Sequence, residues 1–363
     1  MSFQHVYVIA EVGVNHNGDC EKALELVYLA KKSGADAVKF QTFKAERLVT
    51  KTAEKAAYQK QTTESTESQY EMIRKLELSD EDFGRIKALC ADLSIDFLST
   101  AFDSKSLDFL VDKMDVKTLK VGSGELSNSP LLLDHARKGR NIILSTGMAT
   151  LSDIEQALSV LAFGLTETGE TAPSIDAFSE AYASLAGQAA LKDKVTVLQC
   201  TTEYPTPYNE VNLNTLKTLS TCFNLSVGFS DHTLGIVMPV AAVALGAIII
   251  EKHITLSRDL PGPDHMASLN PEEFASMVEG IRQVEIGLGS PVKKPSPSEV
   301  RNKSVARKSL VAVRSIKKGD KFTNENMGVK RPASGISPVH YWDFLGKEAD
   351  RDFSVDELLV LGH

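Results

Sequence analysis

The sequence predicts an α/β protein, built as a closed (β/α)8 TIM barrel and followed by a small, mainly β domain. Eight short apolar or β-branched runs recur before residue 292, and a helical pattern follows each of them. A stretch rich in proline and serine then precedes a shorter tail. Such alternation is typical of this barrel, whose active sites lie at the carboxyl ends of the strands. An open, doubly wound sheet is the alternative, and it would place a site in a crevice.

The expected strands follow one another at spacings that leave room for a helix between them. In chain order they are Val6–Val12, Ala37–Phe43, Asp96–Phe102, Thr118–Gly124, Asn141–Gly147, Thr196–Thr202, Leu225–Asp231 and Ile248–Thr255. Two helix starts carry capping signals: Ser152 with Glu155, and Asn270 with Pro271 and Glu273. Ser152 and Asn270 are therefore predicted to be the N-cap residues of the helices that follow them.

One segment interrupts this rhythm between the fifth helix and the sixth strand. Residues 164–193 are rich in Thr, Glu, Ala and Ser. Connections from a helix to the next strand lie on the barrel face opposite the active site. We therefore predict that this insertion forms a peripheral helix and does not cover the site.

The domain boundary is predicted from composition. Residues 1–292 are assigned to the catalytic barrel, 293–302 to a linker and 303–363 to the small domain, whose first strand is expected at Ser309–Val313. Residues 293–331 contain 12 Lys/Arg and 3 Asp/Glu, although the whole chain has a net charge of -8. A piece as small as the last domain is marginally stable alone, so we expect it to pack against a barrel, its own or that of a partner.

Composition also excludes several classes of protein. The basic stretch lacks aromatic interleaving and a recognition motif, so no nucleic-acid partner is expected. No apolar window is long enough for a membrane span, and no signal peptide is predicted. The four cysteines show no CxxC spacing, which indicates reduced, mostly buried thiols and a cytoplasmic location. Cys200 is interpreted as a small buried hydrophobe, with a nucleophile as the alternative.

Two histidines at the ends of consecutive predicted strands indicate a metal site. His232 ends the run GFSDH, and His253 ends IIIEKH. Because side chains alternate along a strand, His232 shares a face with Ser230, and His253 shares a face with Glu251. Both rings are therefore expected to point into one barrel mouth, where imidazole is a common ligand for divalent metals.

Inward-facing lysines indicate a site for an anion. Lys39 and Gln41 share one face of their strand, and a buried ammonium group requires an anionic partner. That partner is either a structural carboxylate, such as Glu11, or an anionic substrate. Lys120 lies beside the sequence Gly-Ser-Gly, where backbone N–H groups can approach a phosphate or carboxylate closely. Ser123 and Ser145 supply further hydroxyl donors at the neighbouring strand ends.

An ordered set of motifs along nearly the whole chain resembles the sialic acid synthases, which comprise N-acetylneuraminate synthase and the related legionaminate and pseudaminate synthases. The motifs are IAEVGVNHNG, AVKFQTF, LKVGSGE, ILSTGM, CTTEYPTP, GFSDHT, EKHIT, GPDH and KRPASGI. The resemblance implies a barrel that condenses phosphoenolpyruvate with an N-acetylated amino sugar and releases phosphate. It also implies a C-terminal antifreeze-like (SAF) domain that crosses over to the partner's barrel in a homodimer.

The resemblance further implies a role for each matching residue. His232 and His253 would bind a divalent metal ion, most often Mn²⁺, with Mg²⁺ or Co²⁺ as alternatives. The catalytic residues would be Glu11, Lys39 and Lys120, and the phosphoenolpyruvate site would comprise Lys39, Lys120, Ser123, Ser145 and Thr202. The sugar site would comprise Gln41, Glu125, Tyr204, Asp264 and, from the partner subunit, Arg331. Some members have Asn near Thr202, where this chain has threonines.

The substrate and two competing functions remain open at this level. We expect N-acetylmannosamine as the sugar. The alternatives are its 6-phosphate and a 2,4-diacetamido-2,4,6-trideoxy hexose, the precursor of legionaminate or pseudaminate. A Schiff-base aldolase that uses Lys39 or Lys120 as its nucleophile is a competing enzyme class. A barrel without activity that carries a carbohydrate- or ice-binding module is the non-enzymatic alternative.

Overall fold

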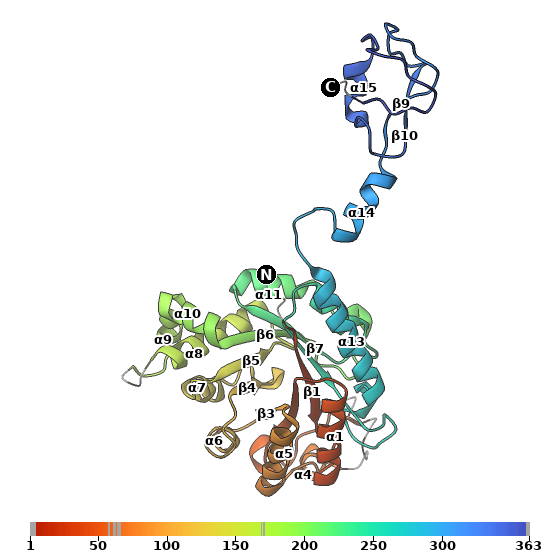
Figure 1. The fold of residues 1–363 in the computed structure, drawn as a ribbon. Coiled ribbons are helices and arrows are strands. Elements are labelled where there is room, and N and C mark those ends of the chain that lie inside the picture. Colours follow the sequence, from red (N-terminus) through yellow and green to blue (C-terminus); the bar gives the residue numbers. More distant parts are fainter. Residues whose placement is uncertain are drawn as a thin grey trace. The chain divides into compact units, whose positions relative to one another are not determined.

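The computed structural model describes residues 5–56, 59–60, 63, 67–167, 169 and 171–360. Its larger unit is a closed barrel of eight parallel strands in the order of the chain, with helices packed around the outside (Figure 1). The predicted closed barrel is therefore confirmed, and the open sheet is wrong. The chain divides into two compact units, residues 1–289 and 290–363.

All eight predicted strands are present, and most end a few residues earlier than expected. Their bounds are β1 (Tyr7–Gly13), β2 (Ala37–Thr42), β3 (Asp96–Ala101), β4 (Thr118–Val121), β5 (Asn141–Ser145), β6 (Val195–Cys200), β7 (Ser226–Asp231) and β8 (Ile249–His253). The strand that begins at Thr118 stops at Val121, because Ser123–Glu125 forms a 3₁₀ turn. The polar residues of Gly122–Glu125 therefore belong to the loop above the barrel.

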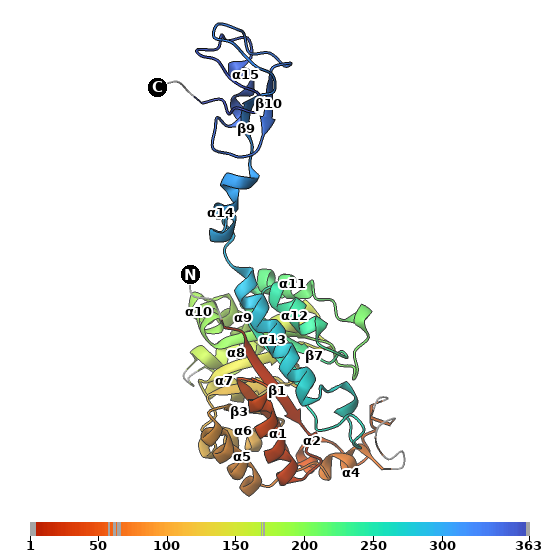
Figure 2. The same ribbon diagram turned by 45° about the vertical axis from the view of Figure 1, so that its right-hand side comes forward.

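The helices outside the strands are mostly short. The barrel helices are α1 (Cys20–Lys32), α2 (Ala45–Leu48), α4 (Gln69–Arg74), α5 (Asp80–Leu93), α6 (Ser104–Asp108), α7 (Ser129–Arg137), α8 (Leu151–Thr166), α9 (Ile175–Ala183), α10 (Leu185–Lys194), α11 (Thr215–Phe223), α12 (Val237–Ala244) and α13 (Pro271–Leu288). Two views show them encircling the strands, with α13 beside α1 (Figures 1 and 2). Their buried apolar faces and the outward faces of the strands form the main hydrophobic core.

The two predicted helix caps have different outcomes. Asn270 caps α13 through a capping box with Glu273, as predicted. The box predicted for Ser152 and Glu155 is wrong, because α8 is capped by Thr150 and Asp153. The Asp153 backbone N–H donates to Thr150 Oγ1 at 3.3 Å, and the Thr150 backbone N–H donates to Asp153 Oδ2 at 2.8 Å. The N-cap and the helix start therefore lie two residues earlier than the sequence pattern suggests, and Ser152 lies exposed in the first turn.

The barrel interior changes from apolar to polar along the strands. A small separate cluster fills its amino-terminal half, and it comprises the buried residues Ile9, Ala37, Leu98, Ile143, Leu198 and Ile249. Two residues further along the same strands, the period-two alternation places Glu11, Lys39, Thr100, Ser145, Cys200 and Glu251 on the inner face. The apolar cluster therefore closes the amino-terminal half of the barrel. The polar layer forms the floor of a cavity at the carboxyl ends of the strands.

The inserted segment forms two helices, α9 and α10, where a single peripheral helix was expected. They contact α8, and α10 also contacts β6, which begins directly after α10 ends. This position is on the barrel face opposite the carboxyl ends of the strands. Ser184 both ends α9 and caps α10, since its hydroxyl accepts a hydrogen bond from the Gly187 backbone N–H at 2.9 Å. A position opposite the active face agrees with the prediction that this segment is no lid.

The second unit contains its own hydrophobic core around a two-stranded antiparallel sheet. Its elements are α14 (Pro297–Ala306), β9 (Ser309–Ala312), β10 (Met327–Lys330) and α15 (Tyr341–Phe344). Eight fully buried apolar residues, among them Leu310, Phe322 and Phe353, form its core. The predicted linker is only partly irregular, because Ser296 caps α14 and the helix continues to Ala306. None of the helices in the described part of the chain has the length and apolar composition that a membrane span requires.

Candidate active site

Four charged side chains meet in the polar layer of the barrel. Lys39 Nζ lies 2.7 Å from Glu11 Oε2 and 3.5 Å from Glu251 Oε2. Lys120 Nζ lies 3.8 Å from the other oxygen of Glu251, which also accepts a hydrogen bond of 2.7 Å from the Ser230 hydroxyl. All four charged side chains are almost completely buried. The structural ion pair between Lys39 and Glu11, considered from the sequence as an alternative, is therefore present.

The two carboxyl groups have opposite pKa shifts. Burial raises the pKa of Glu11 to about 7, and the ammonium group of Lys39 opposes this effect only partly. Burial also disfavours ionised Glu251, but Lys120, Lys39 and Ser230 outweigh it and lower its pKa to about 2. Glu251 therefore serves as a permanent counterion, whereas Glu11 can gain or lose a proton near neutral pH.

The two lysines also differ. Burial would lower the pKa of Lys39, but Glu11 and Glu251 outweigh it and raise that pKa. The pKa of Lys120 is lowered, because burial outweighs its attraction to Glu251. Lys120 donates a 2.6 Å hydrogen bond to Ser145 Oγ, and Lys39 donates one of 3.2 Å to Thr100 Oγ1. Each ammonium group is thus held by a hydroxyl group of the following strand, and both lie near Glu251.

Hydroxyl groups line the cavity next to Lys120. The Gly147 backbone N–H donates to Ser123 Oγ at 3.0 Å, which fixes the position of that hydroxyl. A Cβ at Gly147 would lie only 2.3 Å from Thr202 Oγ1, so this position requires glycine. The Thr202 hydroxyl is buried and has no hydrogen-bond partner among the described residues. A buried donor without a partner, in the same cavity as Lys120, suits an anionic ligand.

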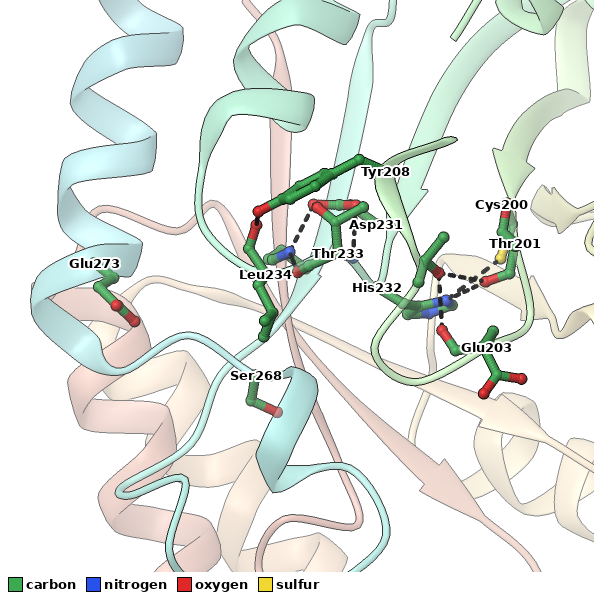
Figure 3. A network of polar contacts seen from close by, with 12 residues as sticks. Cys200, Thr201, Glu203, Tyr208, Asp231, His232, Thr233, Leu234, Ser268 and Glu273 are labelled. Carbon is green, nitrogen blue, oxygen red and sulfur yellow. Dashed lines mark hydrogen bonds and ion pairs between the residues drawn. The ribbon is translucent and has the colours of Figure 1, made fainter. Parts of the chain in front are cut away.

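The two predicted histidines lie side by side at the strand ends. Their ring centroids are 5.6 Å apart, and the Tyr204 ring packs against both. His232 Nδ1 donates to the Thr201 carbonyl at 2.7 Å, and Cys200 Sγ lies 3.9 Å from the same nitrogen (Figure 3). A neutral His232 ring therefore keeps the lone pair on Nε2. His253 Nδ1 is buried and has no hydrogen-bond partner among the described residues.

This pair fits a metal ion, but as an incomplete ligand set. Burial lowers the pKa of His253 well below its ordinary value, which favours the neutral imidazole that binds metals. Burial of His232 is outweighed by Cys200 and the Thr201 carbonyl, which raise the pKa of that ring. Within the described ranges, no cluster of three or more His, Cys, Asp or Glu side chains is arranged to hold a metal ion. An ion held here would take two ligands from these rings, and its other positions would be open to substrate or water.

A buried ion pair lies directly behind the histidines. Lys252 Nζ contacts Asp231 Oδ2 at 2.6 Å, and both side chains are fully buried. These residues are paired across β7 and β8 and point away from the cavity. Thr233 adds two hydrogen bonds to the carboxylate of Asp231 (Figure 3). The pair fixes the register of the two strand ends from which the histidines project.

The structure places most of the predicted site residues around one cavity. This catalytic cavity has a volume of about 120 Å³, and its lining includes Glu11, Lys39, Gln41, Lys120, Ser123, Ser145, Thr202, Tyr204, His232 and His253. A second cavity of about 130 Å³, which we call the mouth pocket, shares Gln41 and Tyr204 with it. The other residues that line the mouth pocket are Val14, Phe43, Leu48, Gln59, Met72, Ile73, Leu76, Pro263 and Asp264. Asp264 therefore lies at the mouth pocket and not in the catalytic cavity.

Two predicted residues lie outside both cavities. Glu125 follows β4 and accepts a 2.7 Å hydrogen bond from the side chain of Asn128. Arg331 belongs to the second unit, where its Nε donates to the Ala306 carbonyl at 2.9 Å and its side chain is exposed. Their contribution to a sugar site stays a prediction.

Sequence reasoning did not assign a role to three residues of the catalytic cavity. Glu251 pairs with both lysines, Ser230 hydrogen-bonds to Glu251, and Thr100 binds Lys39. The signal was available for two of them, because Glu251 and Ser230 lie two residues before a histidine on the inner strand face. Nothing in the sequence around Thr100 distinguishes it from an ordinary strand threonine.

Of the four cysteines, Cys90 and Cys200 are buried, whereas Cys222 is exposed, contrary to the expected burial.

Comparisons with known proteins agree with this architecture. A model of the NeuB family matches residues 26–293, and a model of the SAF domain matches residues 307–363. An N,N'-diacetyllegionaminic acid synthase of Campylobacter jejuni is 45% identical, over 97% of this chain and 98% of its own. Another, of Legionella pneumophila, is 44% identical over 98% and 94%. Among solved structures, the N-acetylneuraminic acid synthetase of Leptospira borgpetersenii has a TM-score of 0.66 and 29% identity, over 83% of this chain and 90% of its own.

The family match spans most of the barrel, including Lys39, Lys120 and both cavity histidines. The SAF match coincides with the small β unit that has its own core. The resemblance derived from the motifs is thereby confirmed at the level of the family and of the second domain. This chain belongs to the NeuB family and carries a SAF domain after its barrel.

Proposed function

We propose that this protein is an N,N'-diacetyllegionaminic acid synthase. It would condense phosphoenolpyruvate with a 2,4-diacetamido-2,4,6-trideoxy hexose and water, and release a nine-carbon 2-keto acid sugar and phosphate. The observation that carries this proposal is identity of 45% and 44% to two enzymes of that name over almost the whole chain. N-acetylmannosamine, our expectation from the sequence, becomes the alternative, because the matched N-acetylneuraminic acid synthetase is only 29% identical.

The polar layer is suited to the phosphoenolpyruvate half of this reaction. Lys39 and Lys120 supply two buried positive charges, and Ser123, Ser145 and Thr202 supply hydroxyl donors around Lys120. These donors would neutralise the phosphate and carboxylate and hold both near the reacting carbon. Phosphate then leaves by cleavage of its C–O bond, after water has added to C2.

Glu11 is suited to act on that water. Its carboxyl group has a pKa of about 7 because of burial, so near neutral pH it can orient water and accept its proton. Lys39 lies 2.7 Å away and would stabilise the charged form of Glu11 between turnovers. Glu251, whose pKa is about 2, remains ionised and compensates the two lysines when the cavity is empty.

His232 and His253 would hold the divalent ion, which we propose to be Mn²⁺, with Mg²⁺ or Co²⁺ as alternatives. When bound, the ion would polarise the aldehyde of the open-chain sugar as a Lewis acid. Chelation of the enzyme should abolish turnover, and added Mn²⁺ should restore it. His232→Ala should be inactive yet retain the wild-type circular dichroism spectrum. Full activity in a preparation shown by metal analysis to be free of divalent ions contradicts this assignment.

The deciding experiment measures phosphate release from phosphoenolpyruvate with one sugar at a time. The 2,4-diacetamido-2,4,6-trideoxy hexose should support turnover, with a kcat/KM at least about tenfold higher than the kcat/KM for N-acetylmannosamine. The reverse order would establish the alternative. Addition of borohydride and pyruvate tests the Schiff-base class, for which the lowered pKa of Lys120 is a favourable feature. We expect no covalent adduct by mass spectrometry.

The same proposal includes a homodimer in which the SAF domain of one subunit contributes Arg331 to the sugar site of the other. Its support is the resemblance of KRPASGI to the corresponding family motif and the exposure of Arg331 in its own unit.

A further inference from the structure

The mouth pocket combines two walls of different chemistry. One wall is apolar and contains Val14, Phe43, Leu48, Met72, Ile73 and Leu76, and the other contains the polar groups of Gln41, Tyr204 and Asp264. Gln41 and Tyr204 also line the catalytic cavity, so the two spaces adjoin through these side chains. A ligand whose reacting end lies at the histidines can therefore extend its other end into the mouth pocket.

The apolar wall is not part of the barrel core. It belongs to a separate hydrophobic cluster, built from the loop after β1, the end of β2, and the helices α2 and α4. Its central residues are at most 9% exposed, yet they leave a cavity where they face the site. An apolar surface preserved beside a polar cavity points to a ligand with an apolar group.

The polar wall contains a carboxylate that awaits a donor. Asp264 is 7% exposed, and its side chain has no hydrogen-bond partner among the residues that the structure describes. Burial raises its pKa to about 6. Because burial disfavours the ionised form of Asp264, an N–H or O–H group of a ligand that donates to this carboxylate would stabilise its charge.

We propose that the mouth pocket binds the C4–C6 end of the sugar and selects a methyl group at C6 over a hydroxymethyl group. This inference rests on the proposed function, because a trideoxy hexose carries that methyl group. The aldehyde carbon reacts in the catalytic cavity, so the rest of the six-carbon chain extends past Gln41 and Tyr204. The C6 methyl group contacts the apolar wall, and an amide N–H or a hydroxyl group donates to Asp264. A hydroxyl group at C6 would lose its water without gaining a partner on this wall.

The test compares two sugars that differ only at C6: the 2,4-diacetamido-2,4,6-trideoxy hexose and the same hexose with a hydroxyl group on C6. The wild-type enzyme should prefer the methyl sugar by about tenfold or more in kcat/KM, as expected for a site that leaves a hydroxyl group unpaired. Val14→Thr keeps the shape of the side chain and adds a hydroxyl group to the wall. This variant should lower the preference by at least about threefold, mainly through better use of the hydroxylated sugar.

Two further variants make the result interpretable. Met72→Gln changes another residue of the apolar wall at similar volume and should shift the preference in the same direction. Val49→Thr is the matched control, because Val49 packs on the same cluster but does not line the mouth pocket. It should leave the preference unchanged. The KM for phosphoenolpyruvate should stay at the wild-type value in all three variants, since none of these residues lines the catalytic cavity.

The outcomes separate the two proposals. Two results would show that the mouth pocket does not distinguish the substituents at C6, and this inference would then be wrong. One is equal use of both diacetamido sugars by the wild type, and the other is the wild-type preference in both Val14→Thr and Met72→Gln. The proposed function stands in that case. If neither diacetamido sugar is used while N-acetylmannosamine is, the proposed function fails, and the inference fails with it.

Discussion

At the scale of single residues, Glu11 and Glu251 show how one cavity gives two identical side chains different properties. Glu251 contacts two lysines and a serine, whereas Glu11 contacts one lysine and is otherwise desolvated. From residue type alone, both carboxyl groups would be expected to have the same pKa. Their surroundings make Glu251 a fixed charge and leave Glu11 able to exchange a proton.

The pH dependence of turnover should report on Glu11. Its pKa is raised to about 7, so its carboxylate form is depleted as the pH falls through that value. If the carboxylate is the active form, kcat decreases about tenfold per pH unit below the pKa. Glu11→Gln should lower kcat by roughly 100-fold or more and abolish this acid limb. A Glu11→Gln enzyme that keeps the limb assigns it to another group.

Lys120 offers a test of the anion site. Lys120→Met removes the charge and the hydrogen bond to Ser145 while keeping most of the side-chain volume. The KM for phosphoenolpyruvate should rise by about tenfold or more, and the KM for the sugar should change much less. The exposed Lys105→Met serves as a control for a general change of charge. An equal rise in both KM values shows that Lys120 does not act on one substrate alone.

At the scale of elements, the start of α8 shows how a helix boundary depends on local geometry. The sequence contains two overlapping capping patterns, and the structure uses the pair Thr150 and Asp153. An N-cap residue typically has an extended backbone, and Thr150 has that conformation with φ of -84° and ψ of 168°.

Thr150→Ala should lower the free energy of unfolding by about 1 kcal/mol, because it removes an N-cap hydrogen bond. Ser152→Ala is the matched control, since Ser152 is equally exposed but lies inside the first turn, and it should change stability by less than about 0.5 kcal/mol. Urea unfolding followed by circular dichroism measures both values. A larger loss in the Ser152 variant contradicts the cap that the structure shows.

At the scale of the whole molecule, the two units have separate hydrophobic cores. A chain that ends at Lys294 should therefore keep a folded barrel with an unchanged cooperative unfolding transition. It should lose most of its activity, because it lacks Arg331 and the SAF domain. Activity equal to that of the full chain contradicts a catalytic contribution of the second unit.

Mixing two inactive variants tests the proposed exchange between subunits. Arg331→Ala and His232→Ala chains, combined into heterodimers, should regain part of the activity, because one of the two composite sites then has both residues intact. Either variant alone serves as the control. If heterodimers form, as shown by mass spectrometry, but stay inactive, Arg331 does not act on the barrel of the other subunit.

The sequence by itself determined the eight strands, the position of the two histidines, the inward lysines and the family. These follow from periodicity and from motifs that are local in the chain, since alternation assigns every second strand residue to one face. The sequence also identified the second domain as separate, because a basic segment that contains prolines precedes it. Such properties need no knowledge of which distant segments meet.

Only the tertiary structure decided which groups contact one another. It placed Glu251 between Lys39 and Lys120, although these residues come from three strands far apart in the chain. It formed the mouth pocket from Val14, Met72 and Asp264, whose segments are brought together by closure of the barrel. Burial and proximity create the pKa shifts and the cavities, and both depend on three-dimensional neighbours that no local pattern contains.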